Sequence, residues 1–116
     1  CPYQARSKTE RASFAYGRPT ENETQRHDEA RLAVATKCTF CVERIDAGTA
    51  RGLKPGMDPE ATPACVNSCI AQALQFGDLD DPQSNVSQLL AENQHFRMHE
   101  ELGTGPRFYY LWDKAP

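Results

Sequence analysis

The first third of the chain is polar, and its few apolar residues are widely scattered. Residues 9–36 hold isolated aromatic and aliphatic side chains among charged ones, with glycine and proline in the middle. The pattern predicts a short strand near residues 14–16 and a short helix over residues 27–34. Because the segment carries so little apolar surface, we expect it to form a surface insertion.

The last third of the chain has clearer hydrophobic periodicity. Residues 73–77 are predicted to form a short strand that ends at a glycine. Asp81 and Pro82 are suited to begin a helix over residues 82–93. We expect the irregular, aromatic-rich tail over residues 94–116 either to pack back on the domain or to dock on a partner subunit. The apolar face of the predicted helix consists of Val86, Leu89 and Leu90.

The stretch between these parts, residues 37–73, holds four of the five cysteines. Cys38 and Cys41 form a C-x2-C pair, and Cys65 and Cys69 form a C-x3-C pair. Such spacings suit a soft metal or an iron–sulfur cluster, because each short pair can bind one centre without stretching the backbone. All four thiolates on one ion would make a zinc site. A two-cluster ferredoxin instead uses the last cysteine of a run for its other cluster, so both interpretations are open at this point.

A ferredoxin run would place a third cysteine at position 44, where this chain has Arg44. The third ligand is therefore predicted to be Cys65, with residues 45–64 looped out between the pairs. That loop is rich in glycine and proline, so it needs no core of its own. Thr62 and Pro63 are a good N-cap and first helical residue, which predicts a short helix carrying both cysteines of the second pair on one face.

The ferredoxin exchange rule gives a specific distribution of ligands. Cys38, Cys41 and Cys65 would bind one cluster, and Cys69 would bind a second. Cys1 is followed by proline, as in the ending of a ferredoxin run, and would bind a third. Each cluster would then need further ligands, which we expect upstream of Cys1 or on another chain.

Composition and motifs exclude several other classes of protein. The net charge of −3 arises from interspersed signs, so the chain has no basic patch for nucleic acid. The odd number of cysteines argues against a self-contained disulfide framework. No phosphate-binding loop, catalytic triad order or zinc-protease motif is present. Asp78, Asp80 and Asp81 are best interpreted as turn and cap residues, so the chain is predicted to be non-catalytic by itself.

Several segments together resemble a known family. They are CPYQAR, KCTFCVERIDAG, TPACVNSC, QALQFGDLDDP, VSQLLAEN and ELGTGPRFYYL. They resemble the C-terminal part of the iron–sulfur (beta) subunit that serves molybdopterin oxidoreductases of the dimethyl-sulfoxide-reductase type, including polysulfide, thiosulfate and tetrathionate reductases. The stretch NSCIAQAL and the aromatic tail are also similar to subunits of sulfite-oxidising (sulfite dehydrogenase) complexes. One departure is Ile70, because the family usually has proline after the last ligand.

The resemblance implies an α+β, ferredoxin-like [4Fe-4S] domain that is small and loop-rich. Residues 1–80 would be the C-terminal part of that domain, with the cluster motif at 37–73 and a surface insertion at 9–36. Residues 81–116 would supply a helix and the aromatic tail. Matched to the family, the complete subunit would hold up to four [4Fe-4S] clusters. The ligands carried over onto this chain are Cys1, Cys38, Cys41, Cys65 and Cys69.

The implied function is electron relay. Single electrons would pass between a molybdopterin-containing catalytic subunit and an integral membrane quinone-reactive subunit or a haem protein. Partner subunits would hold the chain at the membrane, with the cytoplasmic face favoured over the periplasmic one. Arg6, Lys37 and Arg44 lie near ligands in the sequence and are candidates for tuning cluster potentials. The alternative function is a four-cysteine zinc-binding interaction module without redox activity.

Overall fold

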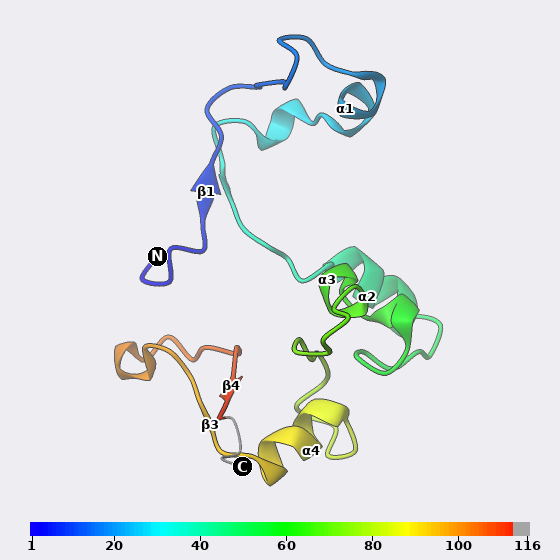
Figure 1. Ribbon diagram of the computed structural model, residues 1–116, viewed down its shortest axis with the longest axis vertical. Coiled ribbons are helices and arrows are strands. Elements are labelled where there is room, and N and C mark those ends of the chain that lie inside the picture. The colour runs from blue at the N-terminus through cyan, green and yellow to red at the C-terminus, as the bar shows by residue number, and fades with distance from the viewer. Residues whose placement is uncertain (113–116) are drawn as a thin grey trace. The chain divides into compact units, whose positions relative to one another are not determined.

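A computed structural model describes residues 1–112 and divides the chain into two compact units, Cys1–Cys38 and Thr39–Pro116 (Figure 1). Short helices and two two-stranded sheets, joined by long loops, make up the described part of both units. The predicted small, loop-rich α+β class is confirmed. None of the helices in the described range is long and apolar enough to cross a membrane.

The first unit is a loop closed by a short antiparallel stem (Figure 1). Strand β1 (Ser7–Lys8) pairs with β2 (Ala35–Thr36), with Ser7 opposite Thr36. The Thr36 hydroxyl donates to the Ser7 carbonyl at 3.3 Å. Next to the stem, the Ala33 amide donates to the Thr9 carbonyl at 2.8 Å. These bonds hold both ends of the intervening residues together.

Within this loop the predicted elements differ from the observed ones. Helix α1 (Glu21–Arg26) begins at Thr20 in a capping box: the Thr20 amide donates to Glu23 at 2.7 Å and the Glu23 amide donates to the Thr20 hydroxyl at 3.3 Å. The predicted helix over residues 27–34 reduces to one 3-10 turn, η1 (Glu29–Arg31). The predicted strand at residues 14–16 is wrong, because the Gly17 amide donates to the Phe14 carbonyl and closes a turn there.

The second unit begins with α2 (Val42–Thr49), which packs against the 3-10 helix η2 (Pro59–Ala61). Ala61 is fully buried, and Gly48 is buried opposite it. A Cβ atom on Gly48 would lie 2.6 Å from the Cβ of Ala61, so only glycine allows this approach. The small core continues into Thr62 and Pro63, directly before the second cysteine pair.

Helix α3 (Ala64–Asn67) follows, with Pro63 at its N-cap. The prediction placed the N-cap at Thr62, one residue too early, because the Thr62 hydroxyl forms hydrogen bonds with the preceding loop and does not cap the helix. It donates to the Asp58 carbonyl at 2.7 Å and accepts from the Gly56 amide at 3.1 Å. This short helix is therefore anchored at its N-terminal end by a buried threonine.

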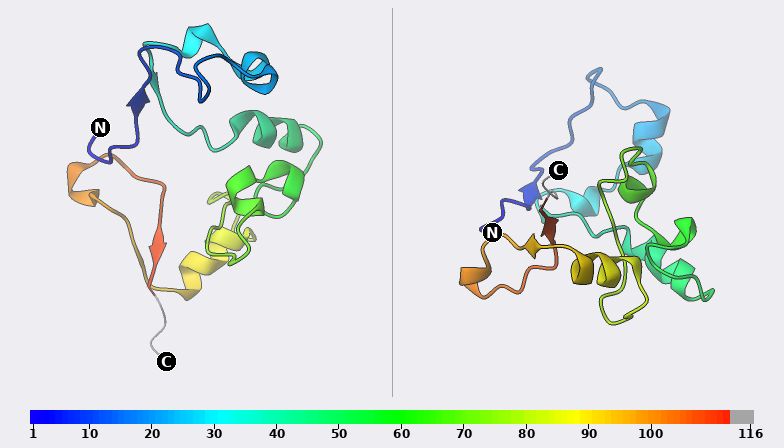
Figure 2. Two further views of the ribbon diagram at one scale, coloured as in Figure 1. Left: turned by 45° about the horizontal axis from the view of Figure 1, so that its top comes forward. Right: turned by 60° about the horizontal axis from the view of Figure 1, so that its bottom comes forward.

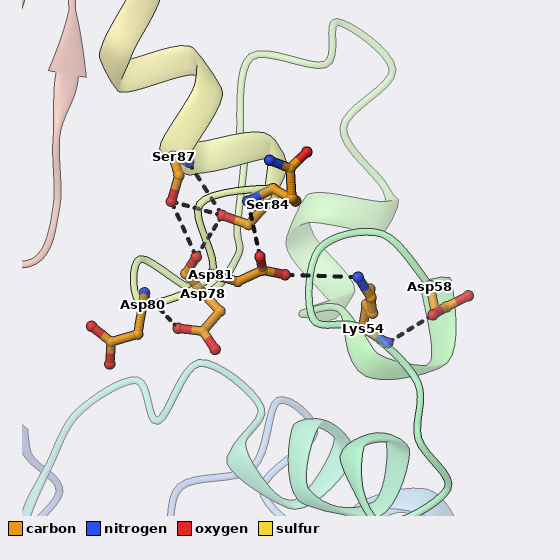
Figure 3. Close-up of polar contacts among 8 residues, drawn as sticks. Lys54, Asp58, Asp78, Asp80, Asp81, Ser84 and Ser87 are labelled. Atoms are coloured by element: carbon orange, nitrogen blue, oxygen red, sulfur yellow. Dashed lines mark hydrogen bonds and ion pairs between the residues drawn. The ribbon is translucent and has the colours of Figure 1, made fainter.

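Helix α4 (Asn85–Glu92) confirms the predicted helix but begins three residues later than expected. Its N-cap is Ser84, whose hydroxyl accepts from the Ser87 amide at 3.2 Å and donates to the Asp78 carbonyl (Figure 3). Asp81 instead accepts from the Gln83 amide at 2.9 Å and closes the preceding turn. The predicted strand over residues 73–77 is wrong, since that stretch has no regular secondary structure and pairs with no strand among the described residues.

The unit ends in an antiparallel ribbon of β3 (His95–Phe96) and β4 (Tyr110–Leu111), connected through η3 (Glu100–Leu102) (Figure 1, Figure 2). Phe96 pairs with Tyr110, and their rings stack with centroids 5.1 Å apart. Trp112 also lies against Phe96 at 5.1 Å. These rings stay partly exposed although they pack on one another. The last residues of the predicted tail, 113–116, lie outside the described range.

Candidate iron–sulfur centre

Cys41 directly precedes α2, at the N-cap position, in a left-handed conformation with φ 57° and ψ 46°. The residue before it, Phe40, is also left-handed, so the chain turns sharply into the helix. The Cys41 carbonyl accepts from the Arg44 and Ile45 amides at 2.9 and 3.0 Å. Its side chain makes no capping hydrogen bond. The backbone of Cys41 thus starts the helix while its thiol stays available for a metal.

Cys65 lies exposed within α3, whereas Cys69 comes after the helix has ended at Asn67. The prediction that one helix carries both cysteines on one face is therefore wrong. The helix is only four residues long because Ser68 caps it with near-zero ψ. The chain then turns again: the Gln72 amide donates to the Cys69 carbonyl at 2.9 Å, and Gln72 itself has a φ of 51°.

This turn brings backbone amides to the Cys69 sulfur. Hydrogen bonds from the Leu74 amide, then from Ala73, and less strongly from Ala71 and Gln72, lower the pKa of the Cys69 thiol, outweighing the opposing effect of desolvation. Amide donors stabilise a thiolate, which is the form that binds iron. The neighbouring Ile70, at the position where the resemblance led us to expect proline, has a fully exposed side chain.

Cys1 and Cys38 belong to the first unit and are exposed. The Cys1 carbonyl accepts from the Gln4 amide at 3.1 Å, which closes a turn at the start of the chain. The Lys37 ammonium donates to the Cys38 carbonyl at 2.6 Å, so a positive charge lies at the backbone of this cysteine. Arg6 is exposed immediately before β1.

Arg44, the third candidate for tuning, is engaged with the backbone. Its Nε and Nη2 atoms donate to the Pro59 carbonyl at 3.3 and 3.0 Å. The Asn67 side-chain amide donates to the same carbonyl at 2.8 Å. Sequence reasoning missed Pro59 and Asn67, because a backbone acceptor leaves no trace in the sequence. The only available signal was the position of Asn67 inside the second cysteine pair.

The described residues contain no ready-made cluster site: among them, no group of three or more histidine, cysteine, aspartate or glutamate side chains is placed to hold a metal ion. The donor chemistry nevertheless fits an iron–sulfur cluster. None of the five cysteines forms a disulfide, and the one after α3 has amide donors that favour its thiolate. The individual ligand assignments stay predictions.

Two carboxylates of the 78–81 turn, those of Asp78 and Asp81, have structural partners, in line with the prediction of turn chemistry. Asp78 accepts from the Asp80 amide at 2.9 Å, and Asp81 lies 3.7 Å from the Lys54 ammonium (Figure 3). Asp58, nearby in the same view, accepts from the Lys54 amide at 2.7 Å. These carboxylates stabilise turns and connect loops, which is a structural role.

Known proteins similar to this chain include iron–sulfur subunits. The chain is 44% identical over 75 residues to the arsenate respiratory reductase iron–sulfur subunit ArrB of Shewanella sp. strain ANA-3, covering 65% of this chain and 27% of that protein. It is 38% identical over 114 residues to a protein of Halobacterium salinarum named as a dimethyl sulfoxide reductase iron–sulfur subunit, covering 96% and 37%. The chain belongs to the iron–sulfur subunits of the dimethyl-sulfoxide-reductase family of molybdoenzymes. The resemblance inferred from the motifs is confirmed.

A third iron–sulfur subunit is similar over almost the whole chain. The Hdr-like menaquinol oxidoreductase iron–sulfur subunit 1 of Archaeoglobus fulgidus is 35% identical over 116 residues, covering 95% of this chain and 39% of that protein. No family model matches the chain. The chain spans less than two fifths of the length of each of these three relatives.

Proposed function

We propose that this chain relays single electrons through [4Fe-4S] clusters between a molybdopterin-containing catalytic subunit and an integral membrane quinone-reactive subunit or a haem protein. The observation that carries the proposal is the set of five cysteines without disulfides, four of them in a C-x2-C pair and a C-x3-C pair, in a chain that belongs to the iron–sulfur subunits. A bound cubane supplies one-electron redox chemistry, and the protein supplies ligands and surroundings.

The five cysteines have distinct roles in this proposal. Cys38, Cys41 and Cys65 would bind one cluster, Cys69 a second and Cys1 a third. The complete subunit would contain up to four clusters, with the remaining ligands outside this chain. Residues 1–80 would form the C-terminal part of a ferredoxin-type domain, and residues 81–116 its helix and aromatic tail.

Charge and hydrogen bonding near the ligands would set the potentials. The ammonium of Lys37 at the Cys38 backbone favours the reduced, more negative form of a nearby cluster. The amides around the Cys69 sulfur act in the same direction. Arg6 and Arg44 are the remaining candidates for such tuning. Partner subunits would hold the protein at the membrane, with the cytoplasmic face favoured.

Metal and sulfide analysis of the complete subunit tests this function against the zinc alternative. We expect a brown protein with broad visible absorption, iron and acid-labile sulfide in equal amounts, and cubane signals in electron paramagnetic resonance after reduction. A colourless protein that contains zinc and no sulfide would overturn the proposal and favour the interaction module.

A further inference from the structure

One carbonyl group, that of Pro59, joins the loop between the two cysteine pairs to the start of α2 by hydrogen bonds. The Pro59 carbonyl accepts from Arg44 at 3.3 and 3.0 Å and from Asn67 at 2.8 Å. We call this group, consisting of Arg44, Asn67 and the Pro59 carbonyl, the Pro59 clamp. Its members come from α2, α3 and η2, three elements that follow one another in the second unit.

Each donor of the clamp is close in sequence to a proposed ligand. Arg44 is in the first turn of α2, three residues after Cys41. Asn67 is two residues from Cys65 and two from Cys69. Restraining these donors on one acceptor therefore restrains the backbone of the second unit near Cys41, Cys65 and Cys69.

The same face of α2 meets the returning loop at successive helical turns. Arg44 and Gly48 are four residues apart, so they lie on one side of the helix. Gly48 is where the helix approaches Ala61, which is fully buried. Farther along, Arg51 forms an ion pair with Glu60 at 2.6 Å between two well-exposed side chains. The contact between α2 and the loop thus runs from Arg44 to Arg51, and the Pro59 clamp lies at its N-terminal end, next to Cys41 in the sequence.

We propose that Arg44 and Asn67 are positioning residues that hold the segment carrying Cys65 next to the start of α2, so that Cys65 can serve together with Cys41 as a ligand of one cluster. Arg44 occupies the position at which an uninterrupted ferredoxin run has its third cysteine ligand. Two guanidinium nitrogens of Arg44 donate to the Pro59 carbonyl and so fix the loop that leads to Cys65, which is proposed to replace that ligand. This inference rests on the proposed function, because it requires Cys65 to bind a cluster.

The test uses the complete subunit in its complex and compares Arg44→Met, Arg44→Lys and Asn67→Leu. Arg51→Met is the matched control, since Arg51 lies just after α2 and also contacts the same loop, through its ion pair with Glu60. The measurement is the rate at which each cubane signal in electron paramagnetic resonance disappears with an iron chelator. Cys65→Ser identifies which signal belongs to the cluster that uses Cys65.

We expect Arg44→Met, which removes both arginine hydrogen bonds to the Pro59 carbonyl, and Asn67→Leu each to speed the loss of that one signal about fivefold, the size of effect that about 1 kcal/mol of lost hydrogen bonding gives at an exposed site. Arg44→Lys should restore much of the wild-type rate, because an ammonium can still donate to the carbonyl. Arg51→Met should leave every rate unchanged.

Two results would overturn the clamp while sparing the proposed function. In the first, Cys65→Ser removes a cubane signal but Arg44→Met and Asn67→Leu behave like Arg51→Met. In the second, both clamp variants accelerate the loss of all signals equally, which would indicate general unfolding. If Cys65→Ser affects no cubane signal, both the clamp and the ligand role of Cys65 are wrong.

Discussion

At the scale of single residues, Cys69 has backbone surroundings that favour its thiolate. Its pKa is lowered chiefly by the Leu74 amide and then by Ala73, which reach the sulfur because the chain turns at Gln72. The spacing of the cysteines alone predicted Cys69 as a ligand, but the hydrogen bonds from backbone amides to its sulfur could not be predicted from the sequence. They belong to the backbone, and their direction depends on a left-handed φ that a glutamine rarely adopts.

The lowered pKa predicts how this thiol reacts when no cluster is bound. In the cluster-free chain, we expect alkylation of Cys69 to begin at a lower pH than that of an ordinary cysteine. Since the folded pKa lies below the unfolded one, ionisation favours the folded turn at pH above the unfolded pKa. That contribution is lost as the pH falls through the folded pKa.

Mass spectrometry of iodoacetamide-treated samples across a pH series gives the measurement. Leu74→Pro removes the amide with the largest effect, so the alkylation profile of Cys69 should move to higher pH. Leu74→Ala keeps the amide and should leave the profile in place. Identical profiles for the two variants would contradict the assignment.

At the scale of elements, the sequence predicted the helix near the C-terminus and missed the one near the N-terminus. Helix α4 has an apolar face that periodicity can detect. Helix α1 reads ENETQR and has no apolar residue, so only its capping box marks it. The strand expected at 73–77 had suitable residues, but no strand among the described residues pairs with it, and a strand needs such a partner.

The cap of α4 predicts a local change in stability. Ser84 is 5% exposed, accepts from the Ser87 amide and donates to the Asp78 carbonyl. Ser84→Ala should therefore destabilise the start of α4 by about 1–2 kcal/mol. Hydrogen exchange of the α4 amides in the complete subunit measures this change.

Ser87→Ala is the matched control, because the Ser87 hydroxyl makes only a 3.4 Å bond to the Asp78 carbonyl in addition to its contact with Ser84. We expect it to have a clearly smaller effect on exchange, below about 0.5 kcal/mol. Equal effects of the two substitutions would show that Ser84 does not cap the helix.

At the scale of the whole molecule, the described part of the chain consists of two units with their own local hydrogen bonds and little buried apolar surface. The five cysteines are divided between them, with Cys1 and Cys38 in the first unit. Such a chain is expected to depend on clusters and partners for stability. The family could be recognised from the motifs, whereas the Pro59 clamp joins residues that only the fold brings together.

The ligand distribution predicts how the chain behaves when expressed alone. No cubane would have four of its thiolates in these 116 residues, so we expect no stable full set of clusters. Iron and acid-labile sulfide per chain, measured after anaerobic reconstitution and gel filtration, should fall well short of two cubanes. Two complete cubanes per chain would contradict the sharing of ligands.

The most direct test of the electron-relay account compares Cys65→Ser with Cys69→Ser in the complete subunit within its complex. The two cysteines are separated by three residues, yet they are assigned to different clusters. Redox-titrated electron paramagnetic resonance should show two distinguishable cubane signals altered, one in each variant. Each variant should also slow electron transfer between the partner subunits, because the clusters act in series. If both substitutions altered the same centre and left every other signal untouched, the electron-relay assignment would be wrong and a single four-cysteine site would replace it.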